Sequence, residues 1–246
     1  MRKKGMLAIL IVSALVFLGS MGVLVHYWLQ DRSDARVRDA VWSLWPGESE
    51  AAGEAPDAAF RDLLAQNPDT IGWLRIDGTG IDDVVMYAPA QEDKYLHLDF
   101  FGNYSVRGTY YVEEACDLQT SDNIIIYGHH MKDGTMFGAL VDYQNAEFAR
   151  AHPTIRFHTI YADHTYEIVA AINTRILSPG ESGFRYYEYT ASNDEQMFRE
   201  YDAFIRLNRL YDTGVELQPG DRLLTLSTCA YHAQDGRFIV VARQID

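Results

Sequence analysis

The stretch DRLLTLSTCAYHAQDGRFIVVARQI, residues 221–245, contains two runs of strand-forming residues separated by a short polar segment. Leu, Ile, Val, Thr and Phe dominate both runs, a composition typical of buried or half-buried strands. The dipeptide Asp235-Gly236 lies between them, and Asp-Gly is a strong turn signal. The sequence therefore predicts a β-hairpin of strands 221–229 and 236–245, in which Cys229 lies near Arg237.

Upstream of this hairpin, most of the predicted elements are short strands separated by turn residues. We expect strands at 71–77, 81–89, 107–114 and 122–130, and a second hairpin over 157–177. Many short strands with few helices between them favour a mainly β fold. An antiparallel or mixed barrel fits this pattern better than a doubly wound sheet does.

The clearest helix is predicted over 192–211, before the cysteine strand. Ser192 followed three residues later by Glu195 is a capping-box pattern. Apolar residues then recur at helical spacing on one face: Met197, Tyr201, Phe204 and Ile205.

The N-terminus indicates a membrane anchor. Arg2, Lys3 and Lys4 precede an uncharged, mainly apolar run over about 6–29, long enough to cross a hydrocarbon core of roughly 30 Å. A cleavable signal peptide is the alternative, but its apolar region is typically only about 7–15 residues long. Because flanking basic residues stay in the cytoplasm, we expect four segments: a cytoplasmic tail at 1–5, a transmembrane anchor at 6–29, an extracellular helical and flexible linker at 30–57, and an extracellular folded domain at 58–246.

The composition restricts the possible partners. A formal net charge of −14 argues against nucleic acid, because binding to phosphates needs clustered Lys and Arg. Two cysteines, Cys116 and Cys229, are too few for a disulfide-rich scaffold. No cluster of His, Cys and Asp has metal-ligand spacing, so neither a metal nor another cofactor is expected.

The pair Cys229 and Arg237 has a chemical use. Opposite residues of a hairpin lie about 4.5–5.5 Å apart, and a nearby positive charge favours the nucleophilic thiolate. The alternative is a buried cysteine and a solvated arginine that happen to be neighbours. A base is also required, and the best candidates are His129 and His130, which end an apolar strand. Adjacent residues of an extended chain point to opposite faces, so only one is expected to enter the site.

Together, these motifs resemble the sortase family. The motif TLSTC is followed by an arginine eight residues after its cysteine, and IYGHHM lies a hundred residues upstream. The similarity covers most of residues 60–246. Several stretches resemble class B sortases in particular: IGWLRIDGTGID, KYLHLDFFGNYSVRGTYYV, YGHHMKDGTMFGAL, LYDTGVE and the helix predicted over 192–211.

The resemblance implies a closed eight-stranded sortase-type β-barrel with an N-terminal helix and the long helix at about 192–211. It implies that Cys229 is the nucleophile, His129 the general acid and base, and Arg237 the oxyanion or substrate stabiliser. The first histidine of the family's YGH motif is the catalytic one, which selects His129 over His130. Four further residues resemble positions of the substrate groove: Ser227, Thr228, Leu96 and Tyr187.

The implied activity is that of a membrane-anchored cysteine transpeptidase. Its partners would be secreted proteins with a C-terminal sorting signal, cleaved after threonine, and an amino group of a peptidoglycan precursor. Two alternatives stay open: a pilin-polymerising sortase that uses a lysine acceptor, and an anchored but inactive binding domain.

Overall fold

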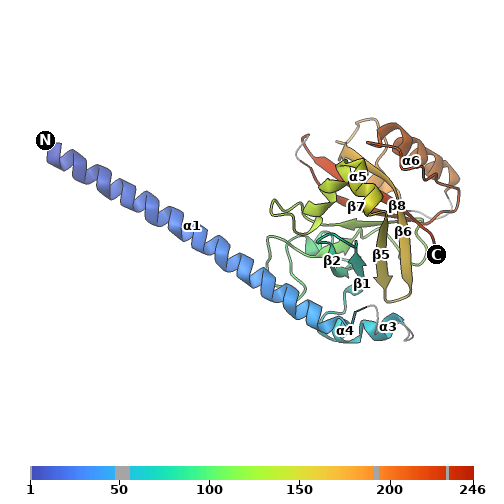
Figure 1. Cartoon of the computed structure of the whole chain (residues 1–246), viewed down its shortest axis with the longest axis horizontal. Coiled ribbons are helices and arrows are strands. Elements are labelled where there is room, and N and C mark those ends of the chain that lie inside the picture. The colour runs from blue at the N-terminus through green and yellow to red at the C-terminus, as the bar shows by residue number, and fades with distance from the viewer. Residues whose placement is uncertain (1, 48–55, 191–193, 231–232) are drawn as a thin grey trace. The chain divides into compact units, whose positions relative to one another are not determined.

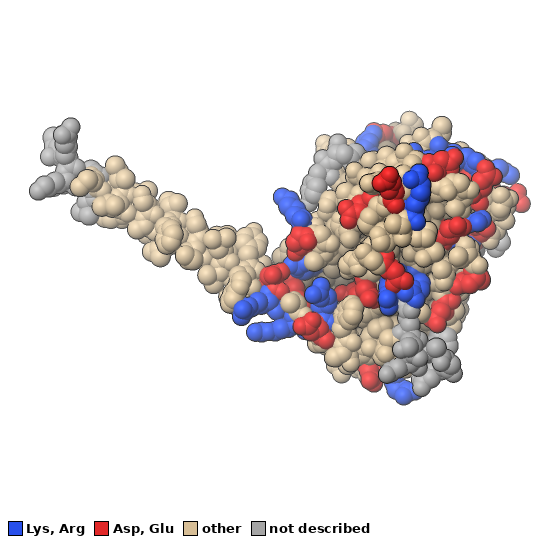
Figure 2. Space-filling view, viewed as in Figure 1, with Lys and Arg blue, Asp and Glu red and all other residues tan. Residues whose placement is uncertain are grey.

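The computed structural model describes residues 2–47, 56–190, 194–230 and 233–246, which form two compact units. The first unit ends at Ala40 and consists of most of helix α1 (Arg2–Leu44). Its segment Ile9–Leu44 is long and apolar enough to cross a membrane, and none of its most apolar window is buried. Residues 9–30 of this helix include no Asp, Glu, Lys or Arg, whereas charges of both signs are interspersed over the folded unit (Figure 2).

The second unit, Val41–Asp246, contains a closed barrel of eight strands (Figure 1). The spatial order is β1-β2-β3-β4-β7-β8-β6-β5, and β1 pairs with β5 to close the barrel. Two neighbouring pairs, β2 with β3 and β4 with β7, are parallel, and the others are antiparallel. The predicted mainly β, closed eight-stranded barrel is thereby confirmed. The strands are β1 (Thr70–Arg75), β2 (Asp82–Met86), β3 (Tyr110–Val112), β4 (Asn123–Tyr127), β5 (Thr154–Thr159), β6 (Asp163–Arg175), β7 (Leu223–Cys229) and β8 (Gly236–Gln244).

Helices lie in the connections between the strands, and two short ones precede β1. Helix α6 (Glu195–Asn208) is shorter than the expected 192–211 at both ends. At its start, the Asp194 side chain accepts a hydrogen bond from the Met197 amide at 2.9 Å and caps the helix, whereas Ser192 lies outside the described residues. At its end, Arg209 is extended and bridges to Ile172 of β6. The helices are α3 (Pro56–Ala59), α4 (Arg61–Gln66), η1 (Lys94–Leu96), η2 (Phe137–Gln144), α5 (Ala146–Ala151), η3 (Tyr186–Glu188) and α6 (Glu195–Asn208).

Strand β7 separates two hydrophobic cores. Leu224 and Leu226 belong to the core inside the barrel. Leu223 belongs to a second core, formed where η3 and α6 cover the outside of β6, β7 and β8. The hydroxyl of Thr225 on the same side bonds to the buried Tyr201 of α6 at 2.9 Å. Because side chains alternate along a strand, every odd-numbered residue of β7, Cys229 included, faces outward.

The folded unit begins earlier than the expected start at residue 58. Val41 is buried, with 2% of its surface exposed. Trp45 stacks on Trp73 of β1, with ring centroids 4.9 Å apart and ring planes 5° from parallel. Trp45 also contacts Phe60 at 4.9 Å. The end of α1 is therefore part of the barrel's packing and not only a connecting segment.

Candidate active site

The β7–β8 register places Cys229 directly opposite Arg237, as the sequence predicts. Asp235 adopts a left-handed conformation, with φ of 53°, which aspartate tolerates in turns. Gly236 then allows a close approach, because a Cβ atom there would lie 2.3 Å from the Ala230 carbonyl oxygen. The Ala230 amide donates to the Gly236 carbonyl at 2.9 Å and closes the ladder immediately beyond Cys229.

The two paired side chains differ in their surroundings. Cys229 is exposed at the end of β7, so its sulfur is accessible to a substrate. Arg237 is half-buried, and its Nη1 donates to the Gly236 carbonyl oxygen at 3.1 Å. Among the described residues, the hydrogen bonds of this guanidinium use Nη1 alone, which leaves further N–H donors for a bound oxyanion.

The parallel pairing of β4 with β7 brings the two histidines to the same end of the sheet as Cys229. The Gly128 amide donates to the Ser227 carbonyl at 3.2 Å, and the Thr228 hydroxyl donates to the Gly128 carbonyl at 2.7 Å. One residue further on, Nδ1 of His130 lies 2.9 Å from the Cys229 carbonyl oxygen. The chain that carries His129 and His130 is therefore bonded to the strand end that carries the thiol.

The His129 ring is fixed by a backbone carbonyl. Its Nε2 lies 2.7 Å from the carbonyl oxygen of Leu96. A carbonyl only accepts hydrogen bonds, so Nε2 carries a proton, and in the neutral ring Nδ1 is the nitrogen with a free lone pair. Burial lowers the pKa of His129, with a contribution from the neighbouring His97, whereas the bond to Leu96 acts in the opposite direction.

His97 is a residue of this site that the sequence did not single out as a candidate, because it stands without a second histidine or a strand end beside it. Its ring stacks on His129, with centroids 5.3 Å apart. The available signal was its position next to Leu96, within the stretch that resembles class B sortases.

The four expected substrate residues are differently placed. Ser227 is fully buried, and its Oγ lies 2.8 Å from the Tyr186 hydroxyl, while Thr228 is 2% exposed. Leu96 is half-buried and contacts His129 through its backbone. Tyr187 is half-buried, and its hydroxyl accepts from the Leu177 amide at 3.2 Å. Their contact with substrate stays a prediction, and for Ser227 and Thr228 the hydroxyls are already bonded within the protein.

Cys116 is unlike Cys229. It is buried in the barrel core, and burial raises the pKa of its thiol to about 12. A thiol in that environment is unreactive at neutral pH. Within the described ranges, no group of three or more His, Cys, Asp or Glu side chains is arranged to hold a metal ion.

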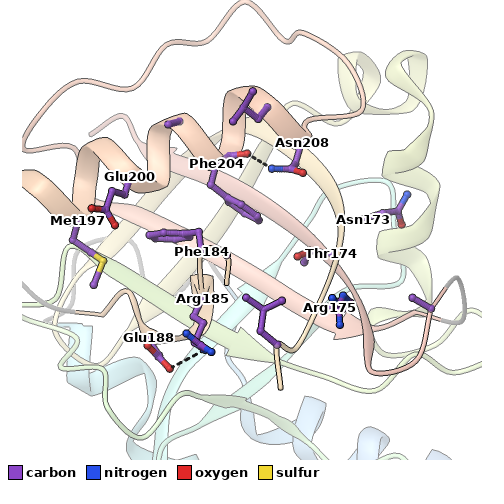
Figure 3. Close-up of a pocket in the computed structure, with 15 residues that line it drawn as sticks. Asn173, Thr174, Arg175, Phe184, Arg185, Glu188, Met197, Glu200, Phe204 and Asn208 are labelled. Carbon is purple, nitrogen blue, oxygen red and sulfur yellow. Dashed lines mark hydrogen bonds and ion pairs between the residues drawn. The ribbon is translucent and has the colours of Figure 1, made fainter. Parts of the chain in front are cut away.

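A pocket of about 840 Å³ lies between α6 and the connection that precedes it (Figure 3). Phe184 and Phe204 provide its apolar wall, and Arg185 pairs with Glu188 at its edge. Ala233 of the β7–β8 turn also lines it, so the pocket reaches the turn that joins Cys229 to Arg237.

Comparison with known proteins gives a consistent result. A family model described as a sortase domain matches residues 74–245. Sortase B of Listeria monocytogenes is 30% identical over 209 residues, which are 84% of this chain and 81% of that protein. Sortase B of Staphylococcus aureus is 29% identical over 189 residues, 76% of this chain and 74% of that protein.

Solved structures show the same likeness. The structure of a mutant sortase B of Clostridium perfringens has a TM-score of 0.75 at 28% identity, covering 86% of this chain and 98% of that one. A sortase B–substrate complex of Staphylococcus aureus has a TM-score of 0.74 at 26% identity, covering 88% and 97%.

Proposed function

This chain belongs to the sortase family as a class B member, a cysteine transpeptidase, and from that premise we propose which reaction it performs and with which residues. It cleaves a secreted protein after threonine in a C-terminal sorting signal. It then transfers that protein to an amino group of a peptidoglycan precursor. The pairing of the exposed Cys229 with Arg237 is the observation that carries this proposal.

In the first half-reaction, the Cys229 thiolate attacks the threonine carbonyl carbon, and the carbonyl π electrons move to oxygen. Arg237 donates N–H groups to that oxyanion. The carbon–nitrogen bond then breaks, and the imidazolium of His129 gives its Nδ1 proton to the leaving amine. A thioester and a neutral His129 remain, with the other ring proton still directed at Leu96.

In the second half-reaction, the acceptor amine attacks the thioester carbonyl. His129 Nδ1 takes the proton that the amine loses, which restores the imidazolium. The carbon–sulfur bond breaks, Cys229 leaves as a thiolate, and an amide bond joins the two partners. The single ring nitrogen Nδ1 therefore serves as acid in one step and as base in the next.

The anchor belongs to the same proposal. Residues 6–29 of α1 span the membrane, with Arg2, Lys3 and Lys4 on the cytoplasmic side and the barrel outside the cell. This places the thiol on the side where secreted proteins emerge and where cell-wall precursors are displayed. The length and apolar surface of the helix support this assignment.

The test is thioester capture. The full-length chain in detergent is incubated with peptides carrying sorting-type motifs, with and without amine acceptors, and followed by mass spectrometry. We expect a peptide adduct on Cys229 that is lost in Cys229→Ala, and a transfer product when the acceptor is present. The same blank result for both proteins with every peptide would reject the transpeptidase. Preference for a lysine side-chain amine would identify a pilin-polymerising enzyme instead.

A further inference from the structure

The segment around η1 holds the His129 ring in two ways. Leu96 provides the carbonyl oxygen at 2.7 Å from Nε2, and His97 provides a ring stacked at 5.3 Å with an interplanar angle of 27°. The first contact fixes the direction of one nitrogen, and the second restricts rotation of the ring about that bond. Together they define the direction of Nδ1, the nitrogen that exchanges the proton.

His97 is itself held by a short closed loop. The Ser105 amide donates to the His97 carbonyl at 3.0 Å, and Leu98 bridges to Tyr104. The largely buried carboxylate of Asp99 accepts the amides of Phe101 at 2.9 Å and Asn103 at 2.8 Å inside this loop. The His97 ring therefore projects from a loop that is fixed by hydrogen bonds, which allows it to hold the His129 ring in place.

A salt bridge also joins the loop that carries His97 to the loop that follows His129. Arg107, near the end of the first loop, pairs with Asp133 of the second loop at 2.8 Å. In that loop the Phe137 amide donates to the His129 carbonyl at 3.0 Å. The backbone of His129 is therefore held by a hydrogen bond that does not involve the His97 side chain.

We propose that His97 is a positioning residue for acyl transfer, holding the His129 imidazole against the Leu96 carbonyl so that Nδ1 is presented to the reacting groups. This inference rests on the proposed role of His129. His97 contacts the ring of His129, the proposed acid and base, and does not act on the reacting atoms directly. The His97 residue itself is exposed. Tyr104 lies beyond it, with ring centroids 6.0 Å apart.

The stack also has an electrostatic consequence. A protonated His97 disfavours a second positive charge on His129, and it contributes to the lowered pKa of that ring. Among the described residues, other titratable or charged groups near the site include His130 on the same segment, Cys229 and Arg237 from β7 and β8, Tyr104 beside His97, and Asp133, which is paired with Arg107. Replacing His97 by phenylalanine keeps a flat aromatic ring and removes the ring nitrogens together with their charge.

The experiment compares the full-length chain in detergent micelles with its His97→Phe and His97→Ala variants. Histidines are labelled at Cε1 for NMR, and the His129 signal is assigned by its loss in His129→Gln. We expect a higher titration midpoint for His129 in His97→Phe, with kcat within about twofold of the wild type. In His97→Ala we expect kcat to fall about tenfold, the upper range of an aromatic contact, while KM changes little.

His152→Ala is the matched control. This half-buried histidine packs on Phe148 at 4.3 Å, and its Nδ1 lies 2.8 Å from the Asp77 carbonyl oxygen. We expect it to lower thermal stability without moving the His129 titration or kcat. Equal losses of kcat in His97→Phe and His97→Ala, or an unchanged kcat in His97→Ala, would overturn the proposal. A shifted midpoint in a chain that turns over no peptide would support the coupling and reject the transpeptidase function instead.

Discussion

Cys229 and Arg237 are the last residue pair of the β7–β8 ladder, and both belong to the row of side chains on the outer face of the barrel. Ile239 and Val241 continue that row on β8 and pack under η3 and α6. The turn after Cys229 is closed by the Ala230–Gly236 hydrogen bond, so the thiol and the guanidinium are held together by backbone geometry.

Arg237→Ala is expected to lower kcat by about 100-fold or more, the usual effect of removing an oxyanion donor. Arg237→Lys retains the charge but not the guanidinium fork, so it is expected to recover only part of that loss. The measurement is the rate of peptide cleavage under saturating substrate. Arg243→Ala is the control on the same strand, because Arg243 pairs with Glu167 and lies opposite Leu223, far along the ladder from Cys229. A kcat of Arg237→Ala equal to that of Arg243→Ala would contradict the assigned role.

The two cysteines are expected to differ in reactivity. An alkylating reagent at neutral pH adds one group to the native protein, at Cys229, because that thiol is exposed. Cys116 reacts only after unfolding, because it is buried and its pKa is raised to about 12. Mass spectrometry of digested protein, before and after denaturant, checks both statements. Labelling of Cys116 in the native protein would show that the barrel core opens more readily than its packing indicates.

Tyr186→Phe is expected to destabilise the folded unit by about 1–3 kcal/mol, because it leaves the buried Ser227 hydroxyl without its partner at 2.8 Å. The double variant with Ser227→Ala is expected to recover part of this loss, since both polar groups are then absent. Denaturant unfolding measures these free energies. If Ser227 instead contacts substrate through its hydroxyl, Ser227→Ala raises KM and leaves stability nearly unchanged.

Acidification is expected to weaken the folded state through His129. Its folded pKa lies below its ordinary value, so the unfolded chain binds more protons in the pH window between the two values. Stability is therefore full above the ordinary value of about 6.5 and declines as pH falls toward the folded pKa. Denaturant titrations at a series of pH values check this, and His129→Gln is expected to flatten the decline. A His129→Gln profile that parallels the wild type would assign the decline to other groups.

Trp45→Ala is expected to lower the free energy of unfolding by about 1–3 kcal/mol, because half-buried aromatic contacts with Trp73 and Phe60 are lost. Thermal unfolding of the full chain in detergent, followed by circular dichroism, measures this. Trp42→Ala is the matched control, since Trp42 is 45% exposed and only its edge meets Trp73, at 6.0 Å. Equal effects of the two variants would show that the stack contributes nothing specific.

Several features of the fold and the site were predictable from local sequence signals. The Asp-Gly turn between two apolar runs predicts the hairpin that joins Cys229 to Arg237, and the structure confirms their pairing. The spacing of turn residues predicts a mainly β barrel. The predicted boundaries of α6 were less accurate. The cap that the structure describes is Asp194, whereas the prediction started the helix at residue 192.

The placement of the histidines depends on contacts that sequence spacing does not encode. Parallel pairing of β4 with β7 joins residues about a hundred positions apart, and it alone brings the His129 segment to the end of the cysteine strand. His97 reaches the site through a loop whose path is set by bonds such as that between Arg107 and Asp133. A single histidine in a polar loop carries no local signal of such a stack.

By itself, the sequence determined the membrane-type helix, the barrel class and the thiol–guanidinium hairpin, because each follows from local composition and from turn chemistry between neighbouring segments. Only the tertiary structure decided that Ser227 faces a buried tyrosine, that Leu96 contacts His129 through its carbonyl, and that His97 stacks on the same ring. The physical reason is that these contacts form only when barrel closure brings distant strands and loops together. The strand pairing of the whole sheet then sets where those segments meet.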